Sequence, residues 1–388
     1  MIQRELEAGR GKTRQEISDI LAKGREAKGL DPAEAAALLQ VEDPDAVPDI
    51  FAAAREVKLK IYGKRLVLFA PLYVSNFCVN NCRYCGFRRD NRALPRKRLE
   101  ISEIAEQTAE IERLGHKRIL LECGESALSD IDYVEEAIAA IYATKEGNGE
   151  IRRVNVNIAA TTVDNYRRLK AAKIGTYQLF QETYHRATYE ALHEGPKKDY
   201  ERQVYAQDRA QEAGIDDVGL GVLFGLFDYR FEVLALLHHA RHLEEMFGVG
   251  PHTISVPRFR PAPGVDFPLP HPVSDEAFKK VVAVLRLAVP YTGMIISTRE
   301  SMEMRAEVFG LGISQTSAGS RTSPGGYGGS ESEGKVCSAQ FETADHRPPE
   351  EVIRSISELG YLPSFCTACY RRGRTGKEFM DLAKPGEI

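Results

Sequence analysis

Three cysteines lie in one short segment of the 388-residue chain. In FCVNNCRYCGF, residues 77–87, Cys78, Cys82 and Cys85 follow the spacing Cys-x3-Cys-x2-Cys. Iron–sulfur cubanes usually take four thiolates, so three protein sulfurs would leave one iron with an open coordination position. As in a catalytic zinc site, an open position lets a small molecule bind the metal directly. The alternative is a structural zinc site that a distant His or Cys completes.

The composition is that of an ordinary globular protein and excludes several function classes. The formal net charge is −4, and no basic face interleaved with aromatic residues occurs, so we expect no nucleic-acid partner. No run of about 18 apolar residues is present, so we expect no membrane span. The charged N-terminus does not resemble a signal peptide. Seven cysteines in such a chain are typical of free thiols or metal ligands, which predicts a cytoplasmic protein.

Short apolar or β-branched runs alternate with amphipathic segments of ten or more residues after Gly63. This alternation is typical of repeated βα units around a parallel sheet. Eight strands with intervening helices favour an α/β fold of the closed (β/α)8 barrel type over an open doubly wound sheet. The expected strands span residues 65–74, 118–124, 153–159, 176–183, 217–225, 252–258, 293–298 and 312–319.

Helical segments precede and follow the predicted barrel. Residues 1–60 have apolar positions at helical spacing, which predicts two or three helices. Ser102 is expected to cap the helix that closes at Gly115, and Thr161 is expected to start the helix that closes at Gly175. We therefore expect an N-terminal helical segment (1–60), the barrel (61–345) and a last helix with a cysteine-containing C-terminal extension (346–388).

The residues that could do chemistry follow the predicted strands. The cysteine triplet follows the first strand, ECGES closes the second and QETYH closes the fourth. PRFRP, STRES and SAGSRTS close the sixth, seventh and eighth. Because active sites in this fold gather at the carboxyl ends of the strands, we expect these residues to converge on one opening of the barrel.

The cysteine triplet, with the aromatic Tyr84 before its third cysteine, resembles the signature of the radical S-adenosylmethionine (SAM) enzymes. The resemblance implies a 4Fe–4S cluster on Cys78, Cys82 and Cys85, whose open iron binds the amino and carboxylate groups of SAM. One electron from the reduced cluster would then cleave the sulfonium to methionine and a 5′-deoxyadenosyl radical that abstracts a hydrogen atom.

The segment Cys123-Gly124-Glu125 resembles the Gly-Gly-Glu element of that superfamily, which binds the methionine amino group of SAM. Cys123 replaces the first glycine and keeps the side chain small. Taken alone, its sulfur is that of a buried thiol. Further candidates for contact with SAM are Tyr84 near the adenine, by the resemblance, Glu182 at the ribose, and Arg258.

An amino acid substrate needs a cation for its carboxylate, and arginine offers a planar fork with two parallel donors. Arg299, after the seventh strand, resembles the carboxylate-binding arginine of the aromatic amino acid lyases, and Ser317 resembles its hydroxyl partner. The alternative for Arg299 is a salt bridge with Glu300 or Glu303.

Longer stretches extend the resemblance to the aromatic amino acid lyase branch, among them LFAPLYVSNFCVNNCRYCGF, FQETYH and PYTGMIISTRES. That branch includes 2-iminoacetate synthase (ThiH), the tryptophan lyases and the tyrosine lyases of FeFe-hydrogenase maturation (the HydG family). Cys366 and Cys369 resemble the start of the Cys-x2-Cys-x22-Cys motif that holds an auxiliary Fe–S cluster in the maturases. The third cysteine would fall just past Ile388. By the same resemblance, His252 helps to hold an extra iron. From spacing alone, two free thiols or a zinc or redox pair would be the favoured interpretation of Cys366 and Cys369.

The resemblance implies a lyase that cleaves the Cα–Cβ bond of L-tyrosine to p-cresol and dehydroglycine. Breakdown of dehydroglycine would yield carbon monoxide and cyanide for the hydrogenase active site. The implied partners are a low-potential electron donor such as ferredoxin or flavodoxin and the scaffold proteins of hydrogenase maturation. The alternatives are 2-iminoacetate synthase and a non-catalytic iron–sulfur carrier, which would not cleave SAM.

Overall fold

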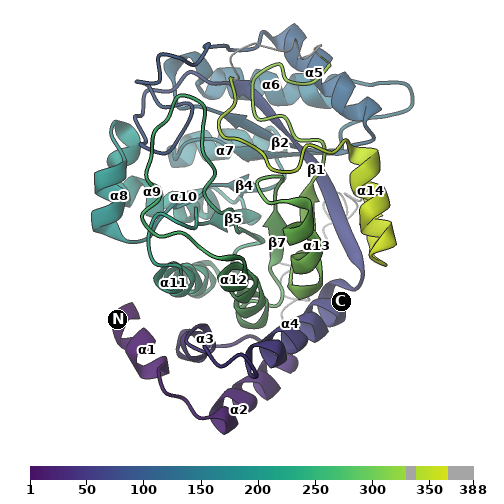
Figure 1. Ribbon diagram of the computed structural model, residues 1–388. Helices are drawn as coiled ribbons and strands as arrows, with labels where there is room; N and C mark the ends of the chain where they lie inside the picture. Colours follow the sequence, from purple (N-terminus) through teal and green to yellow (C-terminus); the bar gives the residue numbers. More distant parts are fainter. Residues whose placement is uncertain (329–337, 366–388) are drawn as a thin grey trace.

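The computed structural model describes residues 1–328 and 338–365 (Figure 1). Four helices begin the chain, where the sequence predicts two or three: α1 (Ile2–Gly9), α2 (Arg14–Arg25), α3 (Pro32–Leu39) and α4 (Val47–Tyr62). Reciprocal capping boxes start α2, through Thr13 and Glu16, and α3, through Asp31 and Glu34. None of the helices in the described ranges combines the length and the apolar character that crossing a membrane requires.

Eight parallel strands form a closed barrel, as predicted. Each strand pairs with its neighbour in chain order, and β1 pairs with both β8 and β2, which closes the sheet. The strands are mostly shorter than the predicted runs, because the ends of those runs form the loops that carry the functional residues. Their bounds are β1 (Arg65–Ser75), β2 (Arg118–Cys123), β3 (Arg153–Asn157), β4 (Tyr177–Gln178), β5 (Val218–Gly221), β6 (Thr253–Ser255), β7 (Gly293–Ile296) and β8 (Gln315–Ser317).

Helices cover the outside of the barrel (Figure 1). Two helix starts differ from the prediction: Glu100 rather than Ser102 caps α5, in a capping box with Glu103, and Thr162 rather than Thr161 caps α7. The helices are α5 (Ile101–Arg113), α6 (Ile131–Ala143), α7 (Val163–Ala171), α8 (Arg186–Leu192), α9 (Tyr200–Val204), α10 (Ala206–Glu212), α11 (Tyr229–Phe247), α12 (Asp275–Ala288), α13 (Met302–Leu311) and α14 (Pro349–Glu358), with short 3-10 turns at Ala127–Ser129 and Pro196–Lys198.

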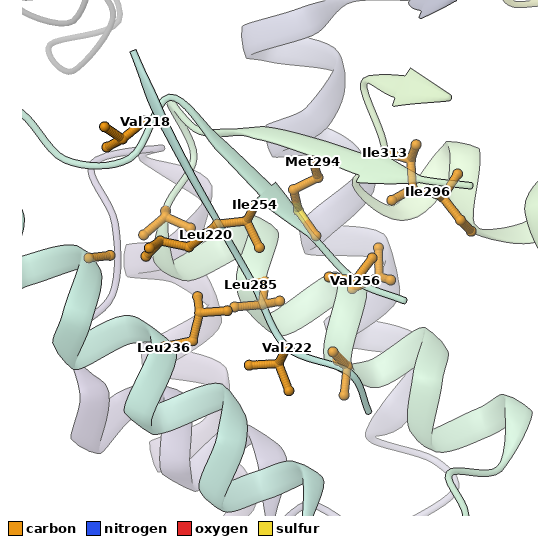
Figure 2. Packing of buried hydrophobic residues seen from close by; sticks show 14 of the residues in the cluster. Val218, Leu220, Val222, Leu236, Ile254, Val256, Leu285, Met294, Ile296 and Ile313 are labelled. Carbon is orange, nitrogen blue, oxygen red and sulfur yellow. The ribbon is translucent and has the colours of Figure 1, made fainter. Parts of the chain in front are cut away.

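Strand alternation turns one set of apolar residues outward against the helices and the residues between them into the barrel. Figure 2 shows the outer face, where side chains of β5, β6 and β7 pack against Leu236 of α11 and Leu285 of α12. Every second residue of these strands faces inward instead, among them Gly219, Gly221 and Ser255. Burying one leucine contributes about 1.5–3 kcal/mol, so the helices hold the barrel while its interior stays free for ligands.

A ninth strand, β9 (Leu362–Ser364), was not predicted. It follows α14 and pairs in parallel with Arg65, Leu66 and Val67 at the beginning of β1. The cysteine loop follows the other end of β1, ten residue steps away, which is about 33 Å of extended chain. The described chain therefore ends, at Phe365, on the opposite side of the barrel from the cysteines.

Candidate active site at the carboxyl ends of the strands

One cavity opens at the carboxyl ends of the barrel strands, as the sequence predicts. Deeper in the barrel, Phe69, Leu120 and Ile295 pack together as its apolar floor. All eight strands or the loops that follow them contribute to the wall. The cavity brings together most of the predicted site residues: Cys78, Cys82, Tyr84, Cys85, Cys123, Gly124, Glu125, Glu182, Arg299 and Ser317.

The cysteine loop is held in place by backbone contacts. Arg96 donates from Nη1 to the carbonyl oxygens of Asn76, at 2.6 Å, and Phe87, at 2.8 Å. Gly124 lies so close to the loop that an added Cβ would collide with the carbonyl oxygen of Phe77. Glycine is therefore required where the end of β2 approaches the cysteines.

The three thiols suit a cluster. Asn80 Nδ2 lies 3.8 Å from Cys78 Sγ, and Gln340 Nε2 lies 3.9 Å from Cys85 Sγ, so amide N–H groups support two of the sulfurs. Burial raises the pKa of Cys85 to about 11 and that of Cys82 further, so metal binding would release protons. Within the described ranges, no His, Cys, Asp or Glu groups are arranged to hold a single metal ion, whereas each corner of a cubane takes one thiolate.

Glu125 is fixed by two partners before any ligand binds. Its Oε1 accepts from Arg202 Nη2 at 2.6 Å, and its Oε2 accepts from Asn80 Nδ2 at 2.6 Å. Asn80 also accepts from the backbone N–H of Lys197 at 2.8 Å. This one amide therefore joins the cysteine loop, the end of β2 and the segment before α9. Next to Glu125, burial raises the pKa of the Cys123 thiol to about 12.

Glu182 forms an ion pair with Lys197 across the cavity wall, with 2.7 Å between Oε1 and Nζ. The backbone of Glu182 is left-handed, at φ +69°, a strain on the order of 1–3 kcal/mol that its bridge to Val222 helps to hold. Burial alone would lower the pKa of Lys197, but the Glu182 carboxylate and the Cys82 thiol outweigh burial and raise it. Lys197 therefore stays charged beside the cysteines.

Tyr84 is oriented by His193. The histidine places Nδ1 2.7 Å from the carbonyl oxygen of Tyr189 and Nε2 2.8 Å from the Tyr84 hydroxyl. A carbonyl can only accept, so Nδ1 carries the proton and Nε2 accepts from Tyr84. Burial lowers the pKa of His193 to about 3, which keeps the imidazole neutral. The Tyr84 ring is thus locked beside the cysteines.

Arg299 has no carboxylate partner among the described residues. Its guanidinium lies over the ring of Phe341, 3.2 Å from the centroid. Both glutamates of the alternative interpretation are excluded as partners, because Glu300 pairs with Arg258 and Glu303 is exposed without an ion pair to Arg299. The partly buried cation is left free to receive a ligand.

Ser317 is positioned by a buried network behind it. Its Oγ accepts from the backbone N–H of Thr298 at 3.3 Å, which joins β8 to the loop after β7. Arg305 donates to the Ser317 carbonyl oxygen at 2.6 Å and forms an ion pair with Asp345. Both Arg305 and Asp345 are almost fully buried, so this support is rigid.

Two polar residues of the cavity were missed by the sequence analysis. Glu122, near the end of β2, accepts from Asn157 Nδ2 at 3.5 Å and lies beside the Tyr73 hydroxyl. Tyr73 donates to Gln340 Oε1 at 2.9 Å. Burial raises the pKa of Glu122 to about 7, although Tyr73 and Arg299 act in the opposite direction. The sequence signal that could have indicated Glu122 is a charged residue at an inward-facing position of a strand that is otherwise apolar.

The structure does not bring Arg258 to the cavity, contrary to expectation. Its guanidinium donates to Asp275 at 2.7 Å, pairs with Glu300 and lies over the Phe278 ring. These partners already neutralise and cover it. Arg260, two residues later, lines the cavity instead.

His252, the predicted ligand of an extra iron, does not line the cavity. His252 precedes β6 at the opposite end of the barrel and is buried, with Nδ1 3.6 Å from Asp217 Oδ1. Phe365 packs beside the start of β2 at that same end. Cys366 and Cys369 lie outside the described residues, so their role and that of His252 stay predictions.

A short segment that we call the mouth strap, residues 339–345, crosses the opening of the cavity. It contributes Gln340 and Phe341 to the cavity wall. Its backbone is hydrogen-bonded to four separate loops of the barrel, through Gly86, Thr322, Pro261 and Thr298. The strap therefore couples the cysteine loop to the region around Arg299, which no local sequence pattern indicated.

The chain matches two family models in succession. Residues 72–240 match the radical SAM superfamily, and residues 255–362 match the biotin and thiamin synthesis associated domain. It is also 33% identical over 332 residues to 2-iminoacetate synthase of Salmonella typhimurium, covering 84% of each protein.

Solved structures of the same fold are more similar still. A crystal structure of HydG, described as a maturase of the FeFe-hydrogenase, is 56% identical, with a TM-score of 0.95 over 99% of this chain and 84% of that one. The FeFe-hydrogenase maturase HydG from Carboxydothermus hydrogenoformans is 44% identical, with a TM-score of 0.87 over 99% of this chain and 92% of that one. The barrel, the three cysteines at its opening and these similarities lead to one conclusion: the chain belongs to the radical SAM superfamily and, within it, to the HydG family.

Proposed function

We propose that the chain is a carbon–carbon lyase that cleaves the Cα–Cβ bond of L-tyrosine to p-cresol and dehydroglycine. The observation that carries the proposal is one cavity lined both by the three cysteines and by Arg299, which forms no ion pair among the described residues. A cofactor on the cysteines and an amino acid on the arginine would share that cavity. The similarity to HydG supports further conversion to carbon monoxide and cyanide for the hydrogenase active site.

The cysteine side would hold the cofactors. A 4Fe–4S cluster and SAM, when bound, supply a radical able to remove a hydrogen atom from a substrate. Glu125, fixed by Arg202 and Asn80, presents carboxylate oxygens for an amino group of SAM, and Glu182 presents one for ribose hydroxyls. The Tyr84 ring would pack against the adenine.

The opposite side would hold the substrate. The Arg299 guanidinium would bind the substrate carboxylate, with the Ser317 hydroxyl as a second donor. The apolar floor of Phe69, Leu120 and Ile295 offers a dry surface for an aromatic ring.

Several further parts of the proposal rest on family similarity. An auxiliary Fe–S cluster on Cys366 and Cys369, with an extra iron at His252, would serve the later steps. The electron donor would be a ferredoxin or flavodoxin, and the product would pass to scaffold proteins of hydrogenase maturation. We also propose a cytoplasmic setting and a division into a helical segment (1–60), a barrel (61–345) and a C-terminal region (346–388).

A second candidate is 2-iminoacetate synthase, which the 33% identity to the Salmonella enzyme favours. The two candidates differ in the steps after tyrosine cleavage. Cyanide and carbon monoxide in the reaction mixture would support the maturase, and their absence together with activity toward a thiazole-forming partner would support the synthase. A non-catalytic iron–sulfur carrier would produce neither and would leave SAM intact.

The test is anaerobic incubation of the cluster-loaded, reduced protein with SAM and either L-tyrosine or L-tryptophan. We expect p-cresol and 5′-deoxyadenosine to accumulate with L-tyrosine alone. An indole product would overturn the substrate assignment, and intact SAM would overturn the enzyme assignment. Cluster spectra recorded with and without SAM provide a readout that does not depend on turnover.

A further inference from the structure

Glu122 is a charged residue of the cavity to which the proposed function gives no role. It lies on β2, two residues after Leu120 of the apolar floor, and lines the cavity. Asn157 on β3 donates to its carboxylate, and the Tyr73 hydroxyl of β1 lies beside it. The hydrogen bond from Asn157 orients the carboxylate without neutralising its charge.

Glu122 differs from the other carboxylates of the cavity in lacking a cation. Glu125 is paired with Arg202, and Glu182 is paired with Lys197, at 2.6 and 2.7 Å respectively. No lysine, arginine or histidine of the described residues forms an ion pair with Glu122. A partly buried carboxylate without a cation is unfavourable, so a ligand that brings a positive charge would be stabilised there.

The complementary unpaired charge is in the same cavity. Arg299 has no anion among the described residues, and both it and Glu122 act electrostatically on the Tyr73 hydroxyl. Tyr73 is therefore close to both charges. An α-amino acid carries its carboxylate and its ammonium on one carbon, so a cation and an anion on either side of a small space would recognise both.

We propose that Glu122 binds the α-ammonium group of the substrate while Arg299 binds its carboxylate. The inference rests on the proposed function, in which the substrate is an amino acid held by Arg299. The side chain of the substrate would then extend toward Phe69, Leu120 and Ile295, which suit a ring and not a charge. A phenol hydroxyl at Glu122 would leave the carboxylate without a cation, which makes the ammonium the better partner.

The proposal makes Glu122 the residue that selects amino acids against carboxylic acids that lack the amine. The test measures binding to cluster-loaded protein with SAM and without reductant, so that no turnover occurs. The probes are L-tyrosine, 3-(4-hydroxyphenyl)propanoate, which lacks the ammonium, and tyramine, which lacks the carboxylate. Calorimetry gives the dissociation constant of each.

We expect Glu122→Gln to weaken L-tyrosine binding about 10- to 100-fold and to leave 3-(4-hydroxyphenyl)propanoate unchanged. Arg299→Gln should weaken both carboxylates and spare tyramine. Glu303→Gln, at an exposed glutamate in the first turn of α13, is the matched control and should change none of the three.

The outcomes separate this inference from the function on which it rests. Equal weakening of L-tyrosine and 3-(4-hydroxyphenyl)propanoate in Glu122→Gln would overturn the inference and leave the tyrosine lyase standing. Wild-type protein that binds no L-tyrosine would overturn both. If the variant does not load its cluster, the dissociation constants of the wild type still test the inference. A wild type that binds L-tyrosine at least 10-fold more tightly than 3-(4-hydroxyphenyl)propanoate supports ammonium recognition. Equal dissociation constants reject it.

Discussion

Two sets of charged residues in the cavity differ in their ion pairs. The first set, which we call the paired side, consists of Glu125 and Glu182, which already form ion pairs with Arg202 and Lys197. The second set, which we call the unpaired side, consists of Glu122 and Arg299, which line the same cavity and form no ion pair among the described residues. The paired side has its geometry fixed in advance, whereas the unpaired side becomes electrostatically complete only when a zwitterion binds.

We infer from this difference that the paired side positions the cofactor and the unpaired side recognises the substrate. Carboxylates that are held in place lose little freedom when a ligand docks, which favours a reproducible arrangement of the cofactor. Unpaired buried charges destabilise the empty site and therefore discriminate strongly between ligands that do and do not match them. Substitutions confined to one side or the other test this distinction, and the largest effect is expected at the cluster.

Replacing a cluster cysteine should remove the function of the paired side completely. Cys82→Ser should lose nearly all cluster iron and sulfide, because a cubane with two protein thiolates is poorly held. Cys123→Ser is the matched control, since this thiol lines the same cavity and is not a predicted ligand. Iron and sulfide analysis after anaerobic reconstitution checks both, and an iron-free Cys123 variant would contradict the ligand assignment.

Removing Lys197 should destabilise the protein more than any other change to an ion pair of the cavity. Lys197→Met leaves the partly buried Glu182 carboxylate without its cation, which should lower the free energy of unfolding by about 1–3 kcal/mol. Lys197→Arg, which keeps a cation, should recover most of the loss. Denaturant unfolding of the three proteins gives the answer, and a Met variant as stable as the wild type would show that the pair does not hold this wall.

On the unpaired side, Arg299→Gln should lower kcat/KM for L-tyrosine about 10- to 150-fold, the loss of a charged hydrogen bond. SAM binding and cluster content should stay unchanged. The matched arginine is Arg258, whose ion pairs lie outside the cavity. Arg258→Gln should lower the melting temperature and leave KM for SAM as it is; a raised KM for SAM would restore the sequence-based expectation for this residue.

Ligand-free stability should depend on pH through Glu122. Its pKa is raised from 4.5 in the unfolded chain to about 7, so its contribution is fully present below about pH 4.5 and is lost as the pH rises through 7. Between pH 5.5 and 8 the wild type should lose on the order of 2 kcal/mol that Glu122→Gln retains. Urea unfolding at the two pH values measures the difference, and parallel losses in both proteins would contradict the unpaired state of this carboxylate.

His193→Phe should have the smallest effect, a destabilisation of about 1–3 kcal/mol from the unsatisfied Tyr84 hydroxyl. The double variant with Tyr84→Phe removes that hydroxyl as well and should recover stability. Thermal unfolding compares the single and double variants. Additive losses would mean that the two side chains act independently.

Local patterns predicted the parts of the fold that repeat. All eight barrel strands and their closure followed from alternation between apolar runs and amphipathic segments. The three-residue β9 did not, because it pairs with β1 almost 300 residues earlier in the chain and has no period of its own. The predicted caps Ser102 and Thr161 were each wrong by one or two residues. The observed N-caps are Glu100 and Thr162.

The sequence predicted the site residues whose type is itself typical of the chemistry, such as the cysteines. It did not predict residues whose position depends on a contact with a distant part of the chain. Cysteine spacing and polar strand ends indicated most of the cavity wall. Arg258 and Arg260 stand in PRFRP, where two prolines remove any regular period, so the sequence could not tell which one faces the cavity. Glu122 and Gln340 come from segments far apart in the chain, and both lie beside Tyr73. Contacts of this kind between distant segments leave no local sequence pattern.

The mouth strap has a consequence for how the protein is made. Gln340, whose amide lies near the sulfur of Cys85, is 255 positions later in the chain. At 5–20 residues per second, a ribosome needs roughly 13–50 s to cover that interval. Throughout this time the cysteine loop is present without the segment that will cross it, so Cys85 gains the neighbouring amide of Gln340 only after most of the chain has been made.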